Sequence, residues 1–124
     1  MNACIASAHI NSDDFGLIAL PFTSSYANTE QLLAYLFAGM TTVLMVDTFT
    51  AHAFFVLVES QHITRMEWVP TMLHIILQYR YKQKYNCNSL VHIGFGGGPL
   101  SKEKFLQLID LFPNAYIIQS YGLT

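Results

Sequence analysis

A glycine-rich turn between an apolar run and a helical pattern is the densest chemical signal in the 124-residue sequence. The segment reads VHIGFGGGPLS over residues 91–101, and its turn residues are Gly96, Gly97, Gly98 and Pro99. Glycine has no Cβ, so a ligand can lie against the backbone, and the free N–H groups that start the next helix favour negative charge. The turn is suited to a nucleotide, although glycines at such a corner also serve tight packing alone.

A second polar segment closes the sequence, directly after an apolar run at residues 116–119. Its residues are Gln119, Ser120, Tyr121, Gly122, Leu123 and Thr124. Open α/β sheets bind ligands at the carboxyl ends of their strands. At that edge the Tyr121 ring could stack on a purine and the Thr124 hydroxyl could bond a phosphate oxygen. Both groups would face the glycine turn from one strand away.

Two other nucleotide interpretations share the glycine pattern. Residues 94–96 are similar to the first motif of methyltransferases that use S-adenosylmethionine, and the dinucleotide fingerprint begins in a similar way. Both need an acidic residue at the end of the next strand, where this sequence has Gln119 and Ser120, and the third glycine of the fingerprint is replaced by Pro99. A methyltransferase is therefore the less favoured alternative.

Metal and disulfide chemistry are not indicated by the sequence. Cys4 and Cys87 are too few and too isolated for a zinc site or a disulfide framework. The five histidines show neither i,i+4 pairing nor the cysteine partners of a metal motif; they are His9, His52, His62, His74 and His92. We predict that these side chains bind no metal.

Five apolar runs recur about 25 residues apart, at residues 17–20, 42–46, 66–69, 91–95 and 116–119. That interval holds a short strand, a helix of about three turns and two loops, which is the rhythm of βα units. The runs are continuous rather than alternating, as in parallel strands that are buried on both faces. The sequence therefore predicts an α/β fold with a mostly parallel sheet of about five strands flanked by helices.

Helix signals lie between these runs. Asn28 is predicted to cap a helix that ends at Gly39, and a second helix is predicted over residues 51–60. Pro70 opens a third helix, because the first turn tolerates a missing N–H. Ser101 is the predicted N-cap of a fourth.

Charged side chains are scarce. Only 11% of the residues are charged, against roughly 25% in soluble domains, while the formal net charge is −2 and the mean hydropathy is +0.34. This composition provides no basic field for nucleic acid or anionic lipid. The longest apolar run, residues 32–46, is shorter than the roughly 20 residues that cross a bilayer. We therefore expect no membrane span and a cytoplasmic protein.

The scarcity of charge is uneven along the chain. Residues 31–46 and 86–101, for example, contain no Asp, Glu, Lys or Arg. Because a domain this small buries only about two thirds of its unfolded surface, such stretches indicate that other protein covers them. We expect a piece of a larger protein or a homo-oligomer, with domain swapping as one route to association.

The whole sequence resembles the AMP-forming adenylating enzymes: acyl-CoA synthetases, aryl-CoA ligases, luciferases and the adenylation domains of nonribosomal peptide synthesis. Five segments are similar to family motifs in the family's order: LPxxH at residues 20–24, AG-x-x-VLM at 38–39 and 43–45 with three residues between them, VPT at 69–71, GGAPLS at 96–101 and QGYGLT at 119–124. The chain departs from these motifs at Ser24, Gly98 and Ser120, where the family usually has His, Ala and Gly.

The resemblance implies roles for individual residues. The implied nucleotide-binding residues are Gly96, Gly97, Gly98, Pro99, Gln119, Ser120, Tyr121, Gly122, Leu123 and Thr124. Among these, Tyr121 would stack on adenine, and Thr124 would contact the phosphate as the catalytic residue. The implied acyl pocket is shaped by Ser24, Tyr26, Val69, Pro70 and Thr71.

The reaction implied by the resemblance joins a carboxylic acid to a thiol in two steps. The carboxylate attacks the α-phosphate of ATP and releases pyrophosphate, and the acyl group then passes from the adenylate to a thiol, usually that of coenzyme A. ATP or AMP, Mg²⁺ and coenzyme A are therefore expected for the full-length enzyme. Stabilising charge on the phosphoryl group is the main task of the protein in such a step.

We expect residues 1–124 to be a single partial domain, an internal fragment of the large N-terminal domain of such an enzyme. The family's phosphate loop, its ribose-binding Asp and the C-terminal domain with its catalytic Lys have no counterpart in the sequence. The fragment is expected to be inactive alone, to hold no cofactor tightly and to have the remainder of the parent chain as its partner. The alternative is a non-catalytic nucleotide-binding or interaction module.

Overall fold

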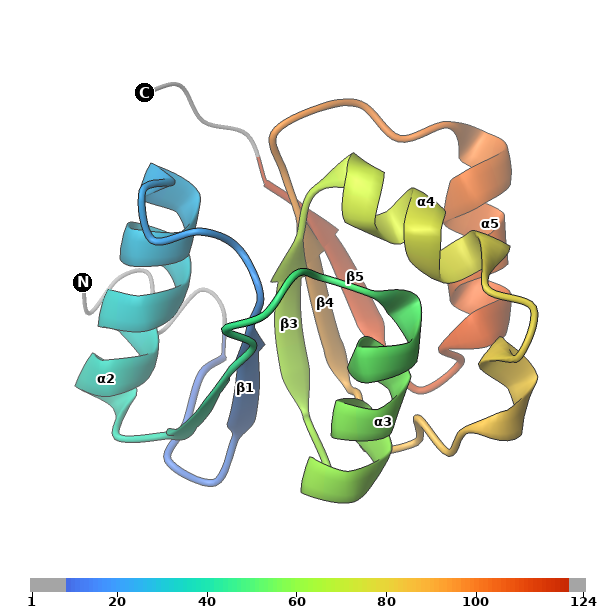
Figure 1. Ribbon diagram of the computed structural model, residues 1–124. Helices are drawn as coiled ribbons and strands as arrows, with labels where there is room; N and C mark the ends of the chain where they lie inside the picture. The colour runs from blue at the N-terminus through green and yellow to red at the C-terminus, as the bar shows by residue number, and fades with distance from the viewer. Residues whose placement is uncertain (1–8, 121–124) are drawn as a thin grey trace.

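The computed structural model describes residues 9–120, which form a five-stranded sheet with helices on both faces (Figure 1). The strands are β1 (Phe15–Ile18), β2 (Thr41–Leu44), β3 (Arg65–Trp68), β4 (His92–Phe95) and β5 (Tyr116–Gln119). All pairs are parallel, and the strand order is β2-β1-β3-β4-β5. The predicted α/β fold with a mostly parallel sheet of about five strands is confirmed.

The first strand differs most from its predicted bounds. It begins at Phe15, two residues before the predicted run at residues 17–20. Phe15 pairs with Thr41 of β2, and its N–H donates to Thr64 Oγ1 at 2.9 Å. The strand ends before Pro21, which has no N–H to donate to a neighbouring strand.

One face of the sheet is covered by α3 (Ala51–Gln61), α4 (Pro70–Gln78) and α5 (Lys102–Leu111) (Figure 1). The predictions for Pro70 and Ser101 are confirmed: Pro70 lies in the first turn of α4, and Ser101 Oγ accepts from Lys104 N at 3.3 Å. A short 3₁₀ helix, η2 (Lys82–Lys84), follows α4. Among residues 9–120, no helix is both long and apolar enough to span a membrane.

The other face is covered by η1 (Tyr26–Leu33), which continues into α2 (Ala34–Ala38). η1 is a π-helix, a rare form that is frequent near functional sites. The predicted cap at Asn28 is wrong, because the helix begins two residues earlier and Asn28 Nδ2 donates back to the Phe22 carbonyl. The predicted stop at Gly39 is confirmed, since Gly39 has the left-handed φ of 71° that suits glycine.

The main core lies between the sheet and helices α3, α4 and α5. Its sheet side is made by Leu17, Met66, Trp68, Ile93 and Phe95, all of which are buried. Burying each such side chain stabilises the fold by about 1.5–3 kcal/mol. These residues belong to the apolar runs from which the strands were predicted.

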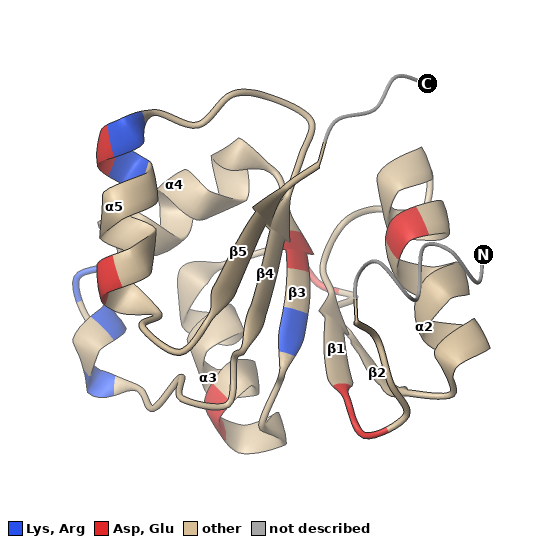
Figure 2. Ribbon diagram, turned by 180° about the vertical axis from the view of Figure 1, so that it is seen from behind, with Lys and Arg blue, Asp and Glu red and all other residues tan. Residues whose placement is uncertain are grey.

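The opposite face of the sheet is polar at its centre, which the sequence pattern does not predict. Arg65 and Glu67 occupy alternate positions of β3 and are both buried. Figure 2 shows them as the blue and red segments of β3. Parallel strands covered on both faces are usually apolar throughout, so a polar layer beneath η1 and α2 calls for a role of its own.

Candidate functional site

The glycine turn leaves β4 at the carboxyl edge of the sheet. Gly96 N donates to Trp68 O at 3.0 Å, so the turn starts while the chain is still bonded to β3. Gly97 has a φ of 82°, a backbone conformation that residues other than glycine rarely adopt. The chain then enters α5 with Ser101 as N-cap. The predicted order of strand, glycine turn and helix is therefore present, with the free N–H groups of the first turn of α5 at its end.

Three predicted site residues from distant parts of the chain meet at this turn. A Cβ on Gly96 would lie 3.2 Å from the Ser120 carbonyl oxygen and 3.4 Å from Cζ of Tyr26. Ser120 N donates to Phe95 O at 2.7 Å, which holds the chain after β5 against β4. The missing Cβ of Gly96 allows Tyr26 and Ser120 to approach the backbone this closely.

Two predicted acyl-pocket residues lie beside the other glycines of the turn. A Cβ on Gly97 would be 3.5 Å from Val69 Cγ1, and a Cβ on Gly98 would be 3.4 Å from Pro70 Cγ. Val69 directly follows β3, which is the neighbour of β4. The predicted nucleotide and acyl segments therefore border each other.

The remaining predicted site residues are not gathered in this way. Ser24 lies in the turn before η1, where its backbone bonds to Pro21 and Asn28. The side chains of Thr71, Pro99 and Gln119 are exposed. Tyr121, Gly122, Leu123 and Thr124 lie outside the described residues, so their roles toward adenine and phosphate stay predictions.

A buried carboxylate, Glu67, lies behind Tyr26, and no motif in the sequence marks it. Tyr26 Oη donates to Glu67 Oε2 at 2.8 Å, and His92 Nε2 lies 3.2 Å from Glu67 Oε1. Gln31 Nε2 of η1 donates to the Glu67 main-chain oxygen at 3.1 Å. The Glu67 and His92 side chains are each only 9% exposed. We call Tyr26, Glu67 and His92 the buried triad.

The surroundings of the buried triad keep the phenol of Tyr26 protonated. Burial foremost, and then the charge and the hydrogen bond of Glu67, raise the pKa of Tyr26 far above its usual 10.0. The Ser120 side chain acts in the opposite sense and lowers this pKa. Burial likewise raises the pKa of Tyr35, a buried residue of α2. Tyr26 is therefore a neutral hydrogen-bond donor to a buried carboxylate.

A second polar pair lies on the same face of the sheet. Arg65 Nε is 3.6 Å from Asp14 Oδ2, and Thr64 Oγ1 donates to Asp14 Oδ1 at 2.9 Å. Asp14 precedes β1 and Arg65 begins β3, so this pair is at the amino end of the sheet, away from the glycine turn. Among residues 9–120 we find no group of three His, Cys, Asp or Glu side chains that could hold a metal ion.

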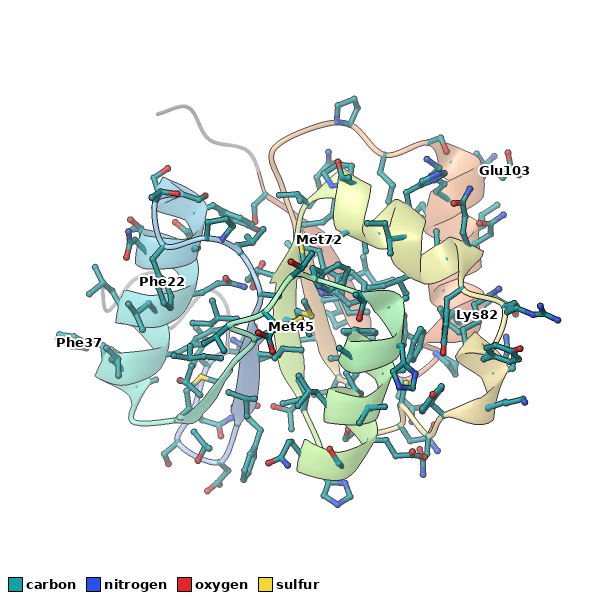
Figure 3. The ribbon with its side chains drawn as sticks, viewed as in Figure 1. Phe22, Phe37, Met45, Met72, Lys82 and Glu103 are labelled. Carbon is teal, nitrogen blue, oxygen red and sulfur yellow. The ribbon has the colours of Figure 1, made fainter. Side chains whose placement is uncertain are left out.

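A separate hollow of about 480 Å³ lies at the far end of α5 from the glycine turn. Its lining includes Glu59, Lys82, Cys87 and Asp110, and it includes no predicted site residue that the structure describes. Figure 3 shows Lys82 near this end and Glu103 at the start of α5. Burial, with a contribution from Glu59, raises the pKa of the Cys87 thiol to about 11.

The structure is a parallel α/β sheet whose glycine turn lies at the carboxyl ends of the strands, the edge at which open α/β sheets bind ligands. The model of the AMP-binding enzyme family matches residues 1–124. The chain therefore belongs to the AMP-binding enzyme family, as the motifs predict.

Curated relatives include plant CoA ligases. The 4-coumarate–CoA ligase-like 9 of Arabidopsis thaliana is 32% identical over 115 residues, which cover 93% of this chain and 20% of that protein. The 4-coumarate–CoA ligase-like 5 of Oryza sativa subsp. japonica is 35% identical over 86 residues, which cover 69% of this chain and 16% of that protein. The chain thus spans a fifth or less of the length of these relatives.

Solved structures share the fold at lower identity. The N-terminal domain of FACL13 from Mycobacterium tuberculosis matches with a TM-score of 0.86 and 20% identity, covering 98% of this chain and 30% of that chain. ATP-bound MatB from Rhodopseudomonas palustris matches with a TM-score of 0.85 and 18% identity, covering 98% and 24%. The sheet described here is the same fold as part of those proteins.

Proposed function

We propose that the chain is part of an AMP-forming acid–thiol ligase and supplies one side of its adenylate pocket and part of its acyl pocket. One observation carries the proposal: Tyr26 and Ser120 converge on Gly96 at the carboxyl edge of the sheet, while Val69 and Pro70 lie beside the next two glycines. Membership of the AMP-binding enzyme family and the CoA ligase relatives support the class of reaction.

In this proposal the glycine turn is a backbone surface for the adenylate. Gly96 is buried, and Tyr26 and Ser120 close against its backbone, so the nucleotide lies along the exposed backbone of Gly97. The first turn of α5, behind Ser101, presents N–H groups that favour the negative charge of the phosphate. Tyr121 stacks on adenine and Thr124 donates to a phosphate oxygen while the substrate carboxylate attacks.

The reaction needs more than this chain supplies. Every residue predicted to bind nucleotide or acyl group is uncharged, and the α-phosphate needs compensating positive charge as the carboxylate attacks. Mg²⁺ and side chains from the rest of the enzyme would supply it. We therefore propose that residues 1–124 are a partial domain, inactive alone and without a tightly bound nucleotide or coenzyme A.

The substrate is a carboxylic acid, and an aromatic one is the first to test. Several relatives are 4-coumarate–CoA ligases by name, and Tyr26 gives the pocket an aromatic wall. Ser24, where the family usually has His, leaves additional room in the predicted pocket. Medium and long acyl chains are the alternatives.

The remainder of the parent chain is the proposed partner. Leu33, Leu36 and Phe37, on the outer side of η1 and α2, are 48%, 61% and 67% exposed. Figure 3 shows Phe37 on α2 and Phe22 in the turn before η1, on the same side of the molecule. Exposed apolar side chains in this number indicate a surface that other protein covers. In the isolated chain, self-association or domain swapping would cover it. A cytoplasmic location is part of the proposal and rests on the sequence alone.

Isothermal titration of the 124-residue chain with ATP and with a nonhydrolysable acyl-adenylate analogue tests the proposal. We expect weak binding of both, and no pyrophosphate release from ATP, Mg²⁺ and 4-coumarate. Tight nucleotide binding without turnover would favour the non-catalytic nucleotide module, and binding of S-adenosylmethionine would favour a methyltransferase. A reading frame that continues past Thr124 with an acidic residue supports the ligase fragment.

A further inference from the structure

The buried triad connects the interior of the sheet to the edge where the two candidate pockets meet. Each oxygen of the Glu67 carboxylate has its own partner: Tyr26 Oη at 2.8 Å and His92 Nε2 at 3.2 Å. The Tyr26 ring also lies close to the glycine turn, because its Cζ would be 3.4 Å from a Cβ on Gly96. Tyr26 thus contacts a carboxylate in the interior and borders the turn that follows β4.

The sheet provides a dedicated space for this carboxylate. Glu67 on β3 is in register with Gly94 on β4. A Cβ on Gly94 would overlap Glu67 Oε2 and would lie 2.5 Å from Cδ. The carboxylate therefore lies over the backbone of β4, beneath η1, where buried polar groups are stable only with fixed partners.

Other ionisable groups also lie on this side of the sheet. The charge of Glu30 on η1 raises the pKa of Tyr26. The pKa of Tyr35 on α2 is raised by the charge of Glu67 and lowered by that of Arg65. Arg65 is itself next to Asp14. Direct contact with the Tyr26 hydroxyl is nevertheless made by Glu67, and Glu67 in turn contacts His92. The path from His92 to Tyr26 therefore runs through the Glu67 carboxylate.

We propose that Glu67 and His92 are positioning residues, which hold the Tyr26 ring in one orientation as the wall between the nucleotide and acyl pockets. The identity of those pockets rests on the function proposed above. Cζ of Tyr26 lies 3.4 Å from the place of a Gly96 Cβ, so rotation of the ring changes the space shared by the two pockets. Loss of the hydrogen bond from Tyr26 to Glu67 should therefore affect binding of the carboxylic acid more than the rate of the chemical step.

Fluorine NMR of the chain labelled with 3-fluorotyrosine tests the anchoring without any ligand. Tyr26→Phe assigns the Tyr26 resonance by its loss. We expect Glu67→Gln to shift this resonance, because the carboxylate that accepts from the Tyr26 hydroxyl is replaced by an uncharged amide. His92→Gln should shift the same resonance although His92 does not contact Tyr26. The double variant should match Glu67→Gln, because the two residues act as one unit.

Matched controls are available elsewhere in the chain. Glu59→Gln and His74→Gln change the same residue types at exposed positions, and they should leave the Tyr26 resonance unchanged. An unshifted Tyr26 resonance in both triad variants overturns the proposal. Should Glu67→Gln fail to fold, His92→Gln decides alone: a shifted resonance supports the proposal and an unshifted one overturns it.

Kinetics of the full-length enzyme separate positioning from a merely structural role. Glu67→Gln should raise the KM for the carboxylic acid roughly tenfold and change kcat less than about twofold. Equal losses in kcat for every substrate, with no change in KM, would contradict positioning. A wild-type enzyme that forms no adenylate would refute the proposed function instead, and the fluorine experiment would still decide whether Glu67 anchors Tyr26.

Discussion

The ring of Phe54 on α3 meets the ring of Trp68 on β3 edge to face, with centroids 5.3 Å apart and ring planes at 78°. Both side chains are fully buried, and Phe54 also lies 6.4 Å from the Phe112 ring at the end of α5. Trp68 is the single tryptophan of the chain. Its fluorescence therefore reports on the contact that holds the helix layer against the sheet.

Phe54→Ala should lower the free energy of unfolding by about 3–5 kcal/mol, because it removes a buried ring and leaves a cavity against Trp68. Urea titration followed by Trp68 emission measures this change. Phe37→Ala is the matched control, since Phe37 is 67% exposed, and it should alter stability by less than about 0.5 kcal/mol. Equal losses in the two variants would contradict the packing described here.

Gly94→Ala should destabilise the fold by about 1–3 kcal/mol, because the new methyl group displaces the Glu67 carboxylate from its two partners. A double-mutant cycle with Glu67→Ala isolates this effect. We expect Gly94→Ala to be substantially milder in the Glu67→Ala background, with a coupling of about 0.5–3 kcal/mol. Additive losses would mean that the carboxylate does not occupy this space.

Cys87 should react slowly with iodoacetamide at pH 8–9, although it lines an open hollow, because its pKa is raised to about 11. Peptide mass spectrometry follows Cys87 separately from Cys4. Glu59→Gln removes one cause of the shift and should speed labelling at pH 9. Between pH 9.0 and about 11 the unfolded chain loses the thiol proton first, so this group lowers stability as pH rises. Labelling at the rate of a free thiol would refute this.

His62→Gly should stabilise the protein by about 0.5–1 kcal/mol, because His62 ends α3 with a φ of 51° that costs a side-chain-bearing residue energy. Thermal unfolding measures the gain. Ser60→Gly, two residues earlier inside the helix, should instead destabilise, since glycine disfavours helix interiors. A loss of stability in His62→Gly would show that its side chain makes a contact that offsets the backbone strain.

The sheet could be predicted because its signal is repeated. Apolar runs about 25 residues apart, joined by helix signals such as Pro70 and Ser101, agree with only a few topologies. The start of η1 could not be predicted in this way. Asn28 is a residue type that commonly caps helices, yet its side-chain amide bonds to the Phe22 carbonyl inside a π-helix that begins at Tyr26. Tyr26 and Gln31 of this helix both bond to Glu67, which is 41 and 36 residues away in the sequence, and local pattern carries no signal of such contacts.

The candidate site was predictable only in part for a similar reason. The glycines at residues 96–98 have a local signature, and Tyr26 was predicted from the family resemblance alone. Glu67 and His92 each lie inside an apolar run, and no local motif links them. They meet because β3 and β4 pair in the sheet, which the sequence pattern does not show. The alternation of Arg65 and Glu67 along β3 was the one available sign of a polar face.

The buried polar layer also determines how this polypeptide behaves in concentrated solution. Asp14, Arg65 and Glu67 place two anions and one cation inside a chain that has only 8 acidic and 6 basic residues. The remaining coat is nearly electroneutral, so copies repel one another weakly and added salt has little repulsion to screen. Dilution or an acidic fusion tag, rather than a change of ionic strength, is what should keep the purified material dispersed.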